Sequence, residues 1–379
     1  MTRAIILSGG WGTRLRPLTC TIPKTLIPVL NTPVIEREML LLKKVGVKEI
    51  VLAVSVMGKD LKNYFRKGEK LGITIHYTKE QSPMGTAGAL KLAEPFLKGD
   101  NFFMLNGDVI LNFNFKALLA THEKYGGIGT IASRLVNNPS RYGVLIIDKQ
   151  TQKIKKFLEK EQYVCSEEAH NKMPVNAGVY VLEPDIFSFI PPKKKLSIEK
   201  DIFPKIAREG KLYHYPISGI WKDIGKPSEL LKGNILLLED VLKKTKDKKE
   251  NLIVKSANIH PSVEIIQPVC IGEKVIINEN CVIGPNVVIG NNVYIEKKCE
   301  IKESLIYQEA YFSQNSTIEY AIISDNCHIR KNVKIKGHEK SLVILASYVE
   351  VNNGIELHTS LNFPITVCHH EVVRENIIQ

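Results

Sequence analysis

The chain has 379 residues, enough for two domains, and its 44% hydrophobic and 24% charged residues are the proportions of a globular protein, which excludes a disordered chain. Its 52 Lys and Arg against 40 Asp and Glu give a net charge of +12, which can indicate a phosphorylated ligand, a nucleic acid or an acidic surface. The basic residues are widely spread, and their few runs, such as 193–195 and 243–249, are interpreted as solvated faces. We therefore expect no nucleic-acid partner.

The seven cysteines are scattered, without the CxxC or Cys/His spacings of a zinc site and without the pattern of a disulfide framework. Such usage is typical of a reducing compartment. The chain passes almost directly from Met1 into an apolar run, which predicts no signal peptide, and no run approaches the roughly 18–20 apolar residues of a membrane helix. These features predict a cytoplasmic protein that binds no membrane.

The first apolar run, residues 4–7, predicts a buried strand that leads into the glycine-rich stretch 9–24. Glycines let backbone N–H groups approach an anion closely, and basic side chains add positive charge. The stretch holds three glycines within four residues and then three cations: Gly9, Gly10 and Gly12, followed by Arg14, Arg16 and Lys24. It lacks the GK[ST] ending of a P-loop and does not run straight into a helix, as a dinucleotide-binding fingerprint would. The stretch is therefore predicted to bind phosphate.

Strands and helices then alternate up to residue 108, which indicates a mostly parallel sheet with helices on both faces. Strands are expected at 50–54, 73–77 and 102–105. Helices are expected at 33–45, between the strand 50–54 and residue 70, and after the glycine turn within the stretch 83–97. Ligands bind beyond the carboxyl ends of the strands in such sheets. The loop 9–12, the stretch Glu80 to Gly85, and Asp108 each follow a strand, so we expect them to share one site.

Asp108 and Asp223 are candidate ligands for Mg²⁺. Asp108 ends the apolar strand of LNGD, and Asp223 lies within GIWKDIGKP. An aspartate is also common as a turn residue or helix cap. Because Mg²⁺ takes one or two carboxylates together with phosphate oxygens and water, the pair in a chain with a phosphate-binding loop favours a metal–nucleotide site.

Four β-rich segments between the two aspartates predict a second, partly antiparallel sheet that forms a lid over the first. These segments are residues 130–132, 143–147, 154–158 and 175–181. Glu159 and Lys160 end one strand, and Asn176 starts another. A lysine and an asparagine at these places can hold a phosphate and a sugar hydroxyl, although such residues are more often surface residues.

From residue 259 to residue 301 an isoleucine occupies every sixth position, and an apolar residue usually stands two positions earlier. A period of six is the signature of a parallel β-helix built from hexapeptides. The phase slips after Ile301 and recovers at Ile323, which predicts a protruding loop or an altered corner. The tail from Leu361 is expected to pack across the helix rather than continue it. Cys281 and Cys299 fall on apolar repeat positions and are interpreted as small core residues.

The predicted fold class is thus α/β: a Rossmann-like, mixed but mostly parallel sheet at residues 1–240, a linker at 241–256, and a left-handed parallel β-helix at 257–379. Many β-helices of this type carry acyl transfer. The two nearest histidines, His260 and His328, are expected to face solvent. A structural or homo-oligomer-forming role is therefore favoured over acyltransferase activity, which stays open as an alternative.

Several motifs together resemble the sugar-1-phosphate nucleotidyltransferases. They follow one another as GGWGTRLRPLT…PK, PMGTAGAL, LNGD, FLEK, NAGVYVL, SIEKDIFPKIA and WKDIGKP, and then come the hexapeptide repeats. The resemblance covers essentially the whole chain. Within this superfamily the chain is most similar to the mannose-1-phosphate guanylyltransferases. It departs from the usual pattern at Glu161 and Thr25, where a proline normally follows the preceding lysine.

The resemblance implies a role for each residue that matches a family motif. It implies catalytic cations at Arg14, Lys24 and Lys160. It implies nucleotide binding by Leu7, Gly9, Gly10, Gly12, Thr13, Arg14, Glu80 and Gly85. It implies sugar-phosphate binding by Gly143, Glu159, Lys160 and Asn176. It implies that Asp108 and Asp223 bind Mg²⁺.

The reaction that the resemblance implies joins a sugar-1-phosphate to an NTP, giving an NDP-sugar and pyrophosphate. The resemblance implies GTP and mannose-1-phosphate as the substrates. The Glu80 carboxylate also favours GTP, because it can accept hydrogen bonds from N1–H and N2–H of guanine. One alternative is a glucose-1-phosphate nucleotidyltransferase that uses UTP, dTTP or ATP. Another is a non-catalytic regulatory subunit that binds nucleotide-sugar. The retained Arg14, Lys24 and Asp108 favour an enzyme.

Overall fold

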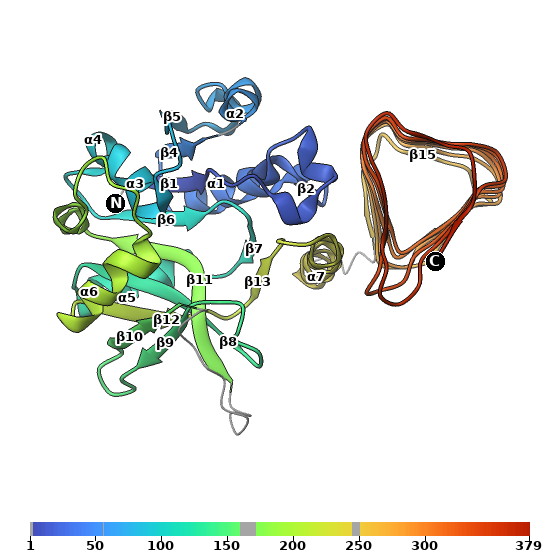
Figure 1. Ribbon diagram of the computed structural model, residues 1–379. Coiled ribbons are helices and arrows are strands. Elements are labelled where there is room, and N and C mark those ends of the chain that lie inside the picture. Colours follow the sequence, from blue (N-terminus) through green and yellow to red (C-terminus); the bar gives the residue numbers. More distant parts are fainter. Residues whose placement is uncertain (1–2, 56, 160–171, 245–250) are drawn as a thin grey trace. The chain divides into compact units, whose positions relative to one another are not determined.

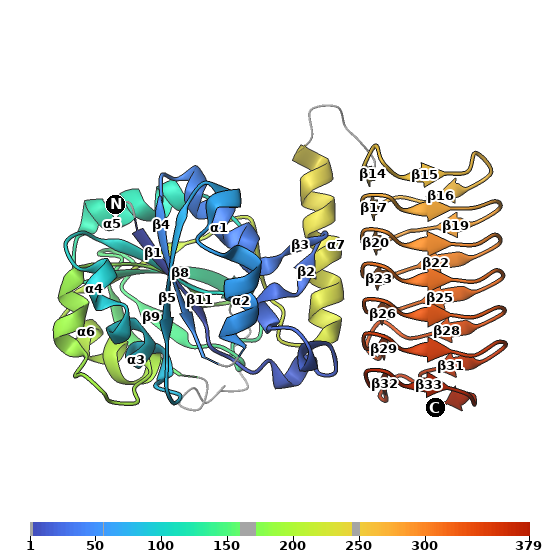
Figure 2. The ribbon, with the colours of Figure 1, turned by 90° about the horizontal axis from the view of Figure 1, so that it is seen from above.

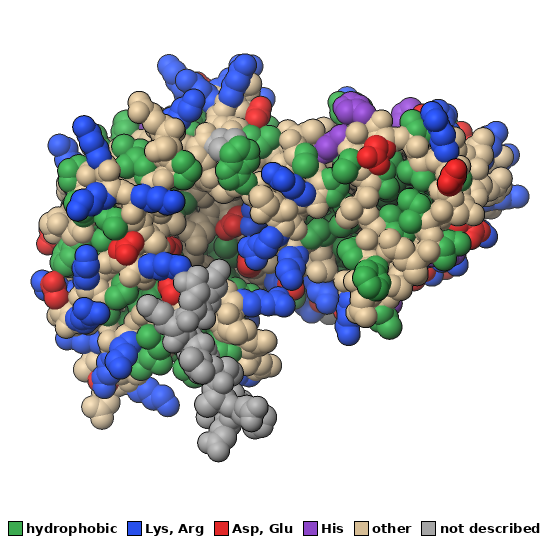
Figure 3. All heavy atoms as spheres, viewed as in Figure 1, with side chains coloured by type: hydrophobic (Ala, Val, Ile, Leu, Met, Phe, Trp, Pro, Cys, Tyr) green, Lys and Arg blue, Asp and Glu red, His purple; other side chains and the backbone are tan. Residues whose placement is uncertain are grey.

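The computed structural model describes residues 3–55, 57–159, 172–244 and 251–379 (Figure 1). Their contacts divide the chain into two compact units, one of Met1–Trp11 with Val34–Trp221 and the other of Gly12–Pro33 with Lys222–Gln379. The domain boundaries expected from the sequence, with a linker at residues 241–256, stay a prediction. On the face of each unit that Figure 3 shows, lysines and arginines are spread out rather than gathered, as the sequence predicts.

The first unit is built on one nine-stranded sheet, whose longest path runs β10-β9-β11-β6-β1-β4-β5. β1 pairs in parallel with β4 and β6, and β4 pairs in parallel with β5, which confirms the predicted parallel half. The strands are β1 (Arg3–Ser8), β4 (Glu49–Val54), β5 (Thr74–Lys79), β6 (Phe102–Asn106), β8 (Gly129–Val136), β9 (Val144–Ile147), β10 (Ile154–Leu158), β11 (Met173–Leu182) and β12 (Leu212–Pro216).

Helices cover both faces of this sheet, as predicted. Successive residues of a strand point to opposite faces. On one face Met104 of β6 packs in a buried cluster with Leu90 and Phe203, while on the other face Phe103 contacts Phe115 with ring centroids 5.8 Å apart. The helices are α1 (Val34–Lys44), α2 (Gly58–Phe65), α3 (Gly85–Leu92), α4 (Glu94–Leu97), α5 (Phe115–Tyr125) and α6 (Phe203–Arg208).

The predicted lid sheet is wrong, because its strands extend the first sheet. Residues 179–182 of β11 pair antiparallel with β6, Val175 pairs with β9, and β8 pairs with β11 from Met173 to Leu182. The register shifts between Asn176 and Tyr180, around Gly178 with its φ of +72°. This irregularity lets one long strand pair with both β9 and β6. Asn176 consequently lies inside β11 and not at its start.

Two short strands complete this part of the chain. β7 (Val109–Asn112) follows the turn after β6, and β13 (Ile220–Asp223) spans the boundary between the two units. The indole of Trp221 donates a hydrogen bond to the carbonyl of Ala177 at 2.8 Å, which fixes the start of β13 to the first unit.

The second unit contains a β-helix of three seven-stranded parallel sheets, which Figure 1 shows end-on as a triangle and Figure 2 as a stack of coils. The first sheet is β14 (Asn251–Ile253), β17 (Val269–Ile271), β20 (Val287–Ile289), β23 (Ser304–Ile306), β26 (Ala321–Ile323), β29 (Val343–Leu345) and β32 (Ile365–Val367). The second is β15 (Asn258–Ile259), β18 (Ile276–Ile277), β21 (Tyr294–Ile295), β24 (Tyr311–Phe312), β27 (His328–Ile329), β30 (Glu350–Val351) and β33 (Val372–Val373). The third is β16 (Glu264–Ile265), β19 (Val282–Ile283), β22 (Glu300–Lys302), β25 (Thr317–Glu319), β28 (Lys334–Lys336), β31 (Glu356–His358) and β34 (Ile377–Ile378).

The coils explain the phase of the repeat. Early coils place partners 18 residues apart, because three hexapeptides make one turn, and the middle coils place them 17 apart. The slip after Ile301 is therefore a corner shortened by one residue, which confirms the altered corner. Ile306, Phe312 and Ile318 continue the buried column through the slip, although counting in sixes did not find them.

The prediction that the tail packs across the β-helix is wrong. Ile365, Val367 and Val373 lie in the core, and β32, β33 and β34 form the last coil. Facing residues in the later coils are 22 positions apart, so loops interrupt the count of six before the inward positions resume. One such loop exposes Leu361 and Phe363.

The second unit also includes the helix α7 (Pro227–Lys244) and the segment 12–33, which forms short 3-10 turns and the hairpin of β2 (Pro28–Val29) and β3 (Thr32–Pro33). Leu230 and Leu238 on α7 are fully buried. Among the described helices, none combines the length and apolarity needed to span a bilayer.

Candidate active site

The first unit provides the beginning of the glycine-rich loop. The carbonyl of Leu7 accepts a hydrogen bond from the N–H of Gly107 at 3.0 Å, and the carbonyl of Gly9 accepts one from the Ser55 hydroxyl. Gly9 and Gly10 are both exposed, and a Cβ on Gly10 would meet no described atom within 4 Å. The backbone after β1 therefore offers an open surface beside Gly10.

The second unit gathers the rest of the loop around Lys24. Gly12 has a φ of +62°, and a Cβ on it would lie 2.9 Å from Cγ2 of Thr19 and 3.1 Å from Cβ of Lys24, so only glycine fits. The Lys24 side chain is buried, and its Nζ lies 4.0 Å from Oδ1 of Asp223. A long side chain packed in this way holds its charge at a fixed place.

Arg14 belongs to the same cluster. Its guanidinium lies so close to Gly225 that a Cβ there would be 2.9 Å from Nη2. Thr13 and Arg14 are exposed on the turn that follows Gly12. The second unit thus brings together Gly12, Arg14, Lys24 and Asp223: two cations and one carboxylate beside a glycine turn. Such a group can bind a polyanion.

Glu80 and Gly85 lie on the connection from β5 to α3. The Glu80 carboxylate accepts a hydrogen bond from the N–H of Met84 at 3.4 Å, and burial raises its pKa. Gly85 begins α3 with a φ of +74°, and a Cβ on it would lie 2.4 Å from the carbonyl oxygen of Leu196. The close packing against Leu196 is therefore sufficient to require glycine at position 85.

Asp108 lies in the turn between β6 and β7, next to a carboxylate that the sequence reasoning missed. Glu38 of α1 is only 1% exposed. Burial, and then the negative charge of Asp108, raise the pKa of Glu38 well above its usual value. A signal for Glu38 existed in the sequence, because this acidic residue is placed on the apolar face of the helix between Ile35 and Leu42.

Three predicted sugar-phosphate residues are neighbours in the first unit. The carbonyl of Gly143 accepts a hydrogen bond from the N–H of Asn176 at 2.8 Å, and a Cβ on Gly143 would lie 3.1 Å from Oε1 of Glu159. Tyr142 and Trp221 add an edge-to-face aromatic pair, 5.1 Å between ring centroids, which the sequence reasoning did not identify. Lys160 lies outside the described residues.

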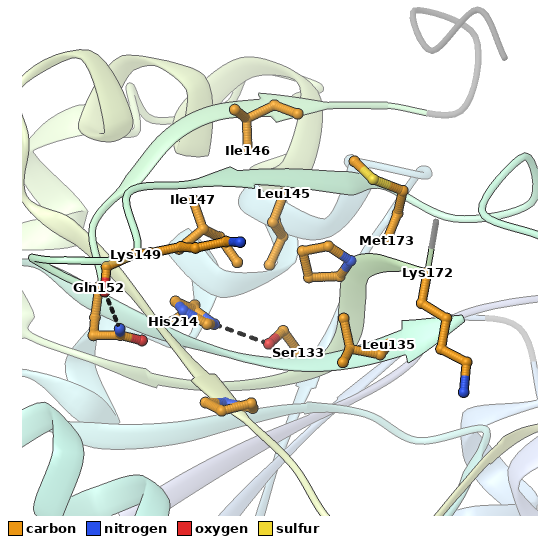
Figure 4. Close-up of a pocket in the computed structure, with 12 residues that line it drawn as sticks. Ser133, Leu135, Leu145, Ile146, Ile147, Lys149, Gln152, Lys172, Met173 and His214 are labelled. Carbon is orange, nitrogen blue, oxygen red and sulfur yellow. Dashed lines mark hydrogen bonds between the residues drawn. The ribbon is translucent and has the colours of Figure 1, made fainter. Parts of the chain in front are cut away.

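A separate hollow of about 750 Å³ lies between β8, β9, β11 and β12, and none of the predicted site residues lines it (Figure 4). Its lining includes the side chains of Leu145 and His214. Nδ1 of His214 is hydrogen-bonded to the Ser133 hydroxyl at 3.0 Å, and burial lowers the pKa of His214 from 6.5 to about 4.

His214 makes the stability of the protein depend on pH. Its pKa is lower in the folded protein than in the unfolded chain, so the unfolded chain takes up a proton first and stability falls as the pH drops from about 7 towards 4. In His214→Asn, which retains a group near the Nδ1 position, we expect the free energy of unfolding to fall less between pH 7 and pH 5. An unchanged pH dependence in the variant would contradict this assignment.

Comparison with known proteins identifies the class. Residues 3–240 match the family described as Nucleotidyl transferase, and residues 265–379 match the GMPPB C-terminal domain. The chain therefore belongs to the nucleotidyl transferase family, and the predicted resemblance is confirmed.

Its relatives include eukaryotic proteins that it matches over about two thirds or more of their length. The chain is 38% identical over 384 residues to mannose-1-phosphate guanyltransferase of Candida albicans, covering 99% of both chains. It is 43% identical to the mannose-1-phosphate guanylyltransferase catalytic subunit beta of Dictyostelium discoideum, covering 64% of this chain and 66% of that one. Among solved structures, HddC of Yersinia pseudotuberculosis complexed with GMP-PN is similar, with a TM-score of 0.53 and 27% identity over 62% of this chain and 98% of that one.

Proposed function

We propose that this enzyme transfers the guanylyl group of GTP to mannose-1-phosphate, releasing pyrophosphate. The observation that carries the proposal is the cluster of Arg14, Lys24 and Asp223 beside the Gly12 turn, in a chain whose Candida albicans relative is a mannose-1-phosphate guanyltransferase along its whole length. Two cations and a carboxylate match what a triphosphate and its counter-ion require.

A phosphate oxygen of the sugar-1-phosphate forms the new bond to the α-phosphorus of GTP, and the bond from that phosphorus to the β-phosphate oxygen breaks. The attacking oxygen already carries negative charge, so the reaction needs no general base. The work of the chain is to bring two polyanions together and to offset their repulsion. Arg14 and Lys24 do this for the triphosphate, and backbone N–H groups of Gly9, Gly10 and Gly12 bind its oxygens. Lys160 is proposed to act on the sugar phosphate.

Asp108 and Asp223 are proposed to hold Mg²⁺. Asp223 fits this use, because its carboxylate is 32% exposed and lies in the same cluster as Lys24, whose Nζ is 4.0 Å from Oδ1. Hard carboxylate oxygens are the donors that Mg²⁺ prefers. When bound, the ion supplies positive charge to the phosphates. The two aspartates set where that charge is held.

The sugar phosphate is proposed to bind beside Gly143, Glu159 and Asn176, which the first unit holds together. Leu7, Thr13 and Gly85 complete the proposed nucleotide-binding set, with Glu80 facing the base. An anionic carboxylate accepts from both N1–H and N2–H of guanine, whereas uracil would present an oxygen lone pair to it.

Glu80→Gln is expected to lower the preference for GTP over UTP by at least about tenfold, because the amide offers an N–H to one of guanine's donors and the hydrogen bonds lose their charge. The preference is measured as the ratio of kcat/KM values for the two nucleotides. Glu123→Gln, on the exposed side of α5, is the matched control. An unchanged ratio in Glu80→Gln would remove Glu80 from base selection.

We further propose that the β-helix forms a homo-oligomer and that the enzyme works in the cytoplasm. Tyr348, Val372 and Ile378 are large exposed side chains of the β-helix, whose apolar surface an interface between copies would remove from water. Cys281 and Cys299 are buried thiols, which supports a reducing compartment. Sedimentation of the purified chain tests the first of these proposals.

Pyrophosphate release, measured for GTP, UTP, dTTP and ATP with mannose-1-phosphate and glucose-1-phosphate, tests the proposed function. The expected result is fastest release with GTP and mannose-1-phosphate. Fastest release with glucose-1-phosphate and another nucleotide would establish that alternative instead. No release from any pair would favour a regulatory subunit.

A further inference from the structure

The segment from Pro17 to Asn31, which contains Lys24, is hydrogen-bonded to the β-helix at both ends. The carbonyl of Pro17 accepts a hydrogen bond from Nε2 of His369 at 3.0 Å, across 352 positions of sequence. At the other end Nδ2 of Asn31 donates to the carbonyl of Ile289 at 2.7 Å, across 258 positions. Ile289 lies in β20 and His369 lies in the last coil, so separate coils hold the two ends.

The hairpin within this segment is also fixed. The buried Tyr307 hydroxyl donates to the carbonyl of Pro28 at 3.4 Å. The N–H of Leu30 donates to Oδ1 of Asn234 at 2.8 Å, and Asn234 on α7 is only 1% exposed. Leu30 and Asn31 have φ values of +46° and +61°, a two-residue turn that presents the Asn31 amide to the β-helix.

The anchored segment is also hydrogen-bonded to the glycine-rich loop. Thr19, two residues after Pro17, donates its hydroxyl hydrogen to the carbonyl of Gly12 at 2.8 Å. Arg14 lies between these two positions in the chain, and Lys24 lies between the two anchored ends. A shift of the segment relative to the coils would therefore move both cations.

We infer that the β-helix positions the catalytic cations, with His369 and Tyr307 as positioning residues that touch no substrate. The inference rests on the proposed function, because it concerns the same Arg14 and Lys24. Electrostatic stabilisation requires the charges to be placed before the reaction begins, and a misplacement of about 1 Å can cost a hundredfold in rate. A rigid stack of coils supplies such a fixed support, whereas a surface loop alone does not.

His369→Leu tests the inference, because it removes the donor to Pro17. We expect kcat/KM for GTP to fall by about tenfold, the effect of one lost hydrogen bond to a half-buried carbonyl, with the KM for mannose-1-phosphate unchanged. His369→Gln, whose amide can donate from a place near Nε2, should restore most of the rate. Tyr307→Phe, which keeps the ring and removes only the hydroxyl, should lower the rate in the same direction.

His328→Leu, which changes an exposed histidine in β27, is the matched control and should keep the wild-type rate. Hydrogen exchange of the peptide covering residues 13–33 gives a readout independent of activity, and it should become faster in His369→Leu at an unchanged thermal midpoint. Wild-type kinetics and wild-type exchange in His369→Leu would overturn the inference and leave the proposed function intact. If the wild-type chain shows no transfer at all, the proposed function fails, and the exchange result alone decides whether His369 holds the segment.

Discussion

Lys24→Gln is expected to lower kcat for nucleotidyl transfer by about 100-fold or more, while the chain still folds. Lys24 is the buried cation of the glycine-rich loop, and its Nζ lies 4.0 Å from Asp223. A positive charge held at a fixed place, away from bulk water, stabilises the charge that builds up as pyrophosphate leaves, and removal of one such group typically costs this much. The rate is measured as pyrophosphate release at saturating GTP and mannose-1-phosphate.

Lys255→Gln, an exposed lysine of the β-helix, is the control for a general loss of positive charge. Because Lys24 also neighbours Asp223, the thermal midpoint of Lys24→Gln is measured alongside the rate. A variant that folds normally and turns over at nearly the wild-type rate would exclude Lys24 from the chemistry.

Asp108→Asn is expected to lower activity by at least about 100-fold at low Mg²⁺ and to raise the concentration of Mg²⁺ needed for half-maximal rate. The amide retains the shape of the carboxylate but not its charge, so the ion would be held less tightly. Asp60→Asn, an exposed change in α2, is the control. The measurement is a Mg²⁺ titration of the initial rate. An unchanged titration would show that Asp108 is a turn residue only.

Periodic parts of the fold could be predicted from sequence. The β1 strand is a short apolar run, and the isoleucine column repeats every six residues because each inward position stacks on the next coil. The shortened corner after Ile301 hid Ile306 and Phe312, since one missing residue changes the count without changing the packing. The last coil was missed for a similar reason, because loops separate its inward residues from those before it.

Parts that depend on distant contacts could not be predicted. β11 was assigned to a separate lid, because nothing local to Gly178 shows that the strand continues into pairing with β6. The grouping of the segment 12–33 with the β-helix depends on pairs such as Asn31 with Ile289, 258 positions apart. Several predicted site residues could be grouped from the sequence alone, because they follow strands of one parallel sheet, whose carboxyl ends lie at the same edge. Glu38 was not predicted to lie at the site, because helical periodicity alone shows it only as one polar residue on an apolar face.

The proposal of a guanylyl transferase is tested most directly by following labelled oxygen. Mannose-1-phosphate with oxygen-18 in its non-bridging phosphate positions is incubated with GTP, Mg²⁺ and the full chain. The masses of the products are then measured by mass spectrometry. The account predicts GDP-mannose that retains all of the label and pyrophosphate that carries none, because a sugar-phosphate oxygen attacks the α-phosphorus. Label in the pyrophosphate, or the absence of GDP-mannose while another nucleotide-sugar forms, would contradict it.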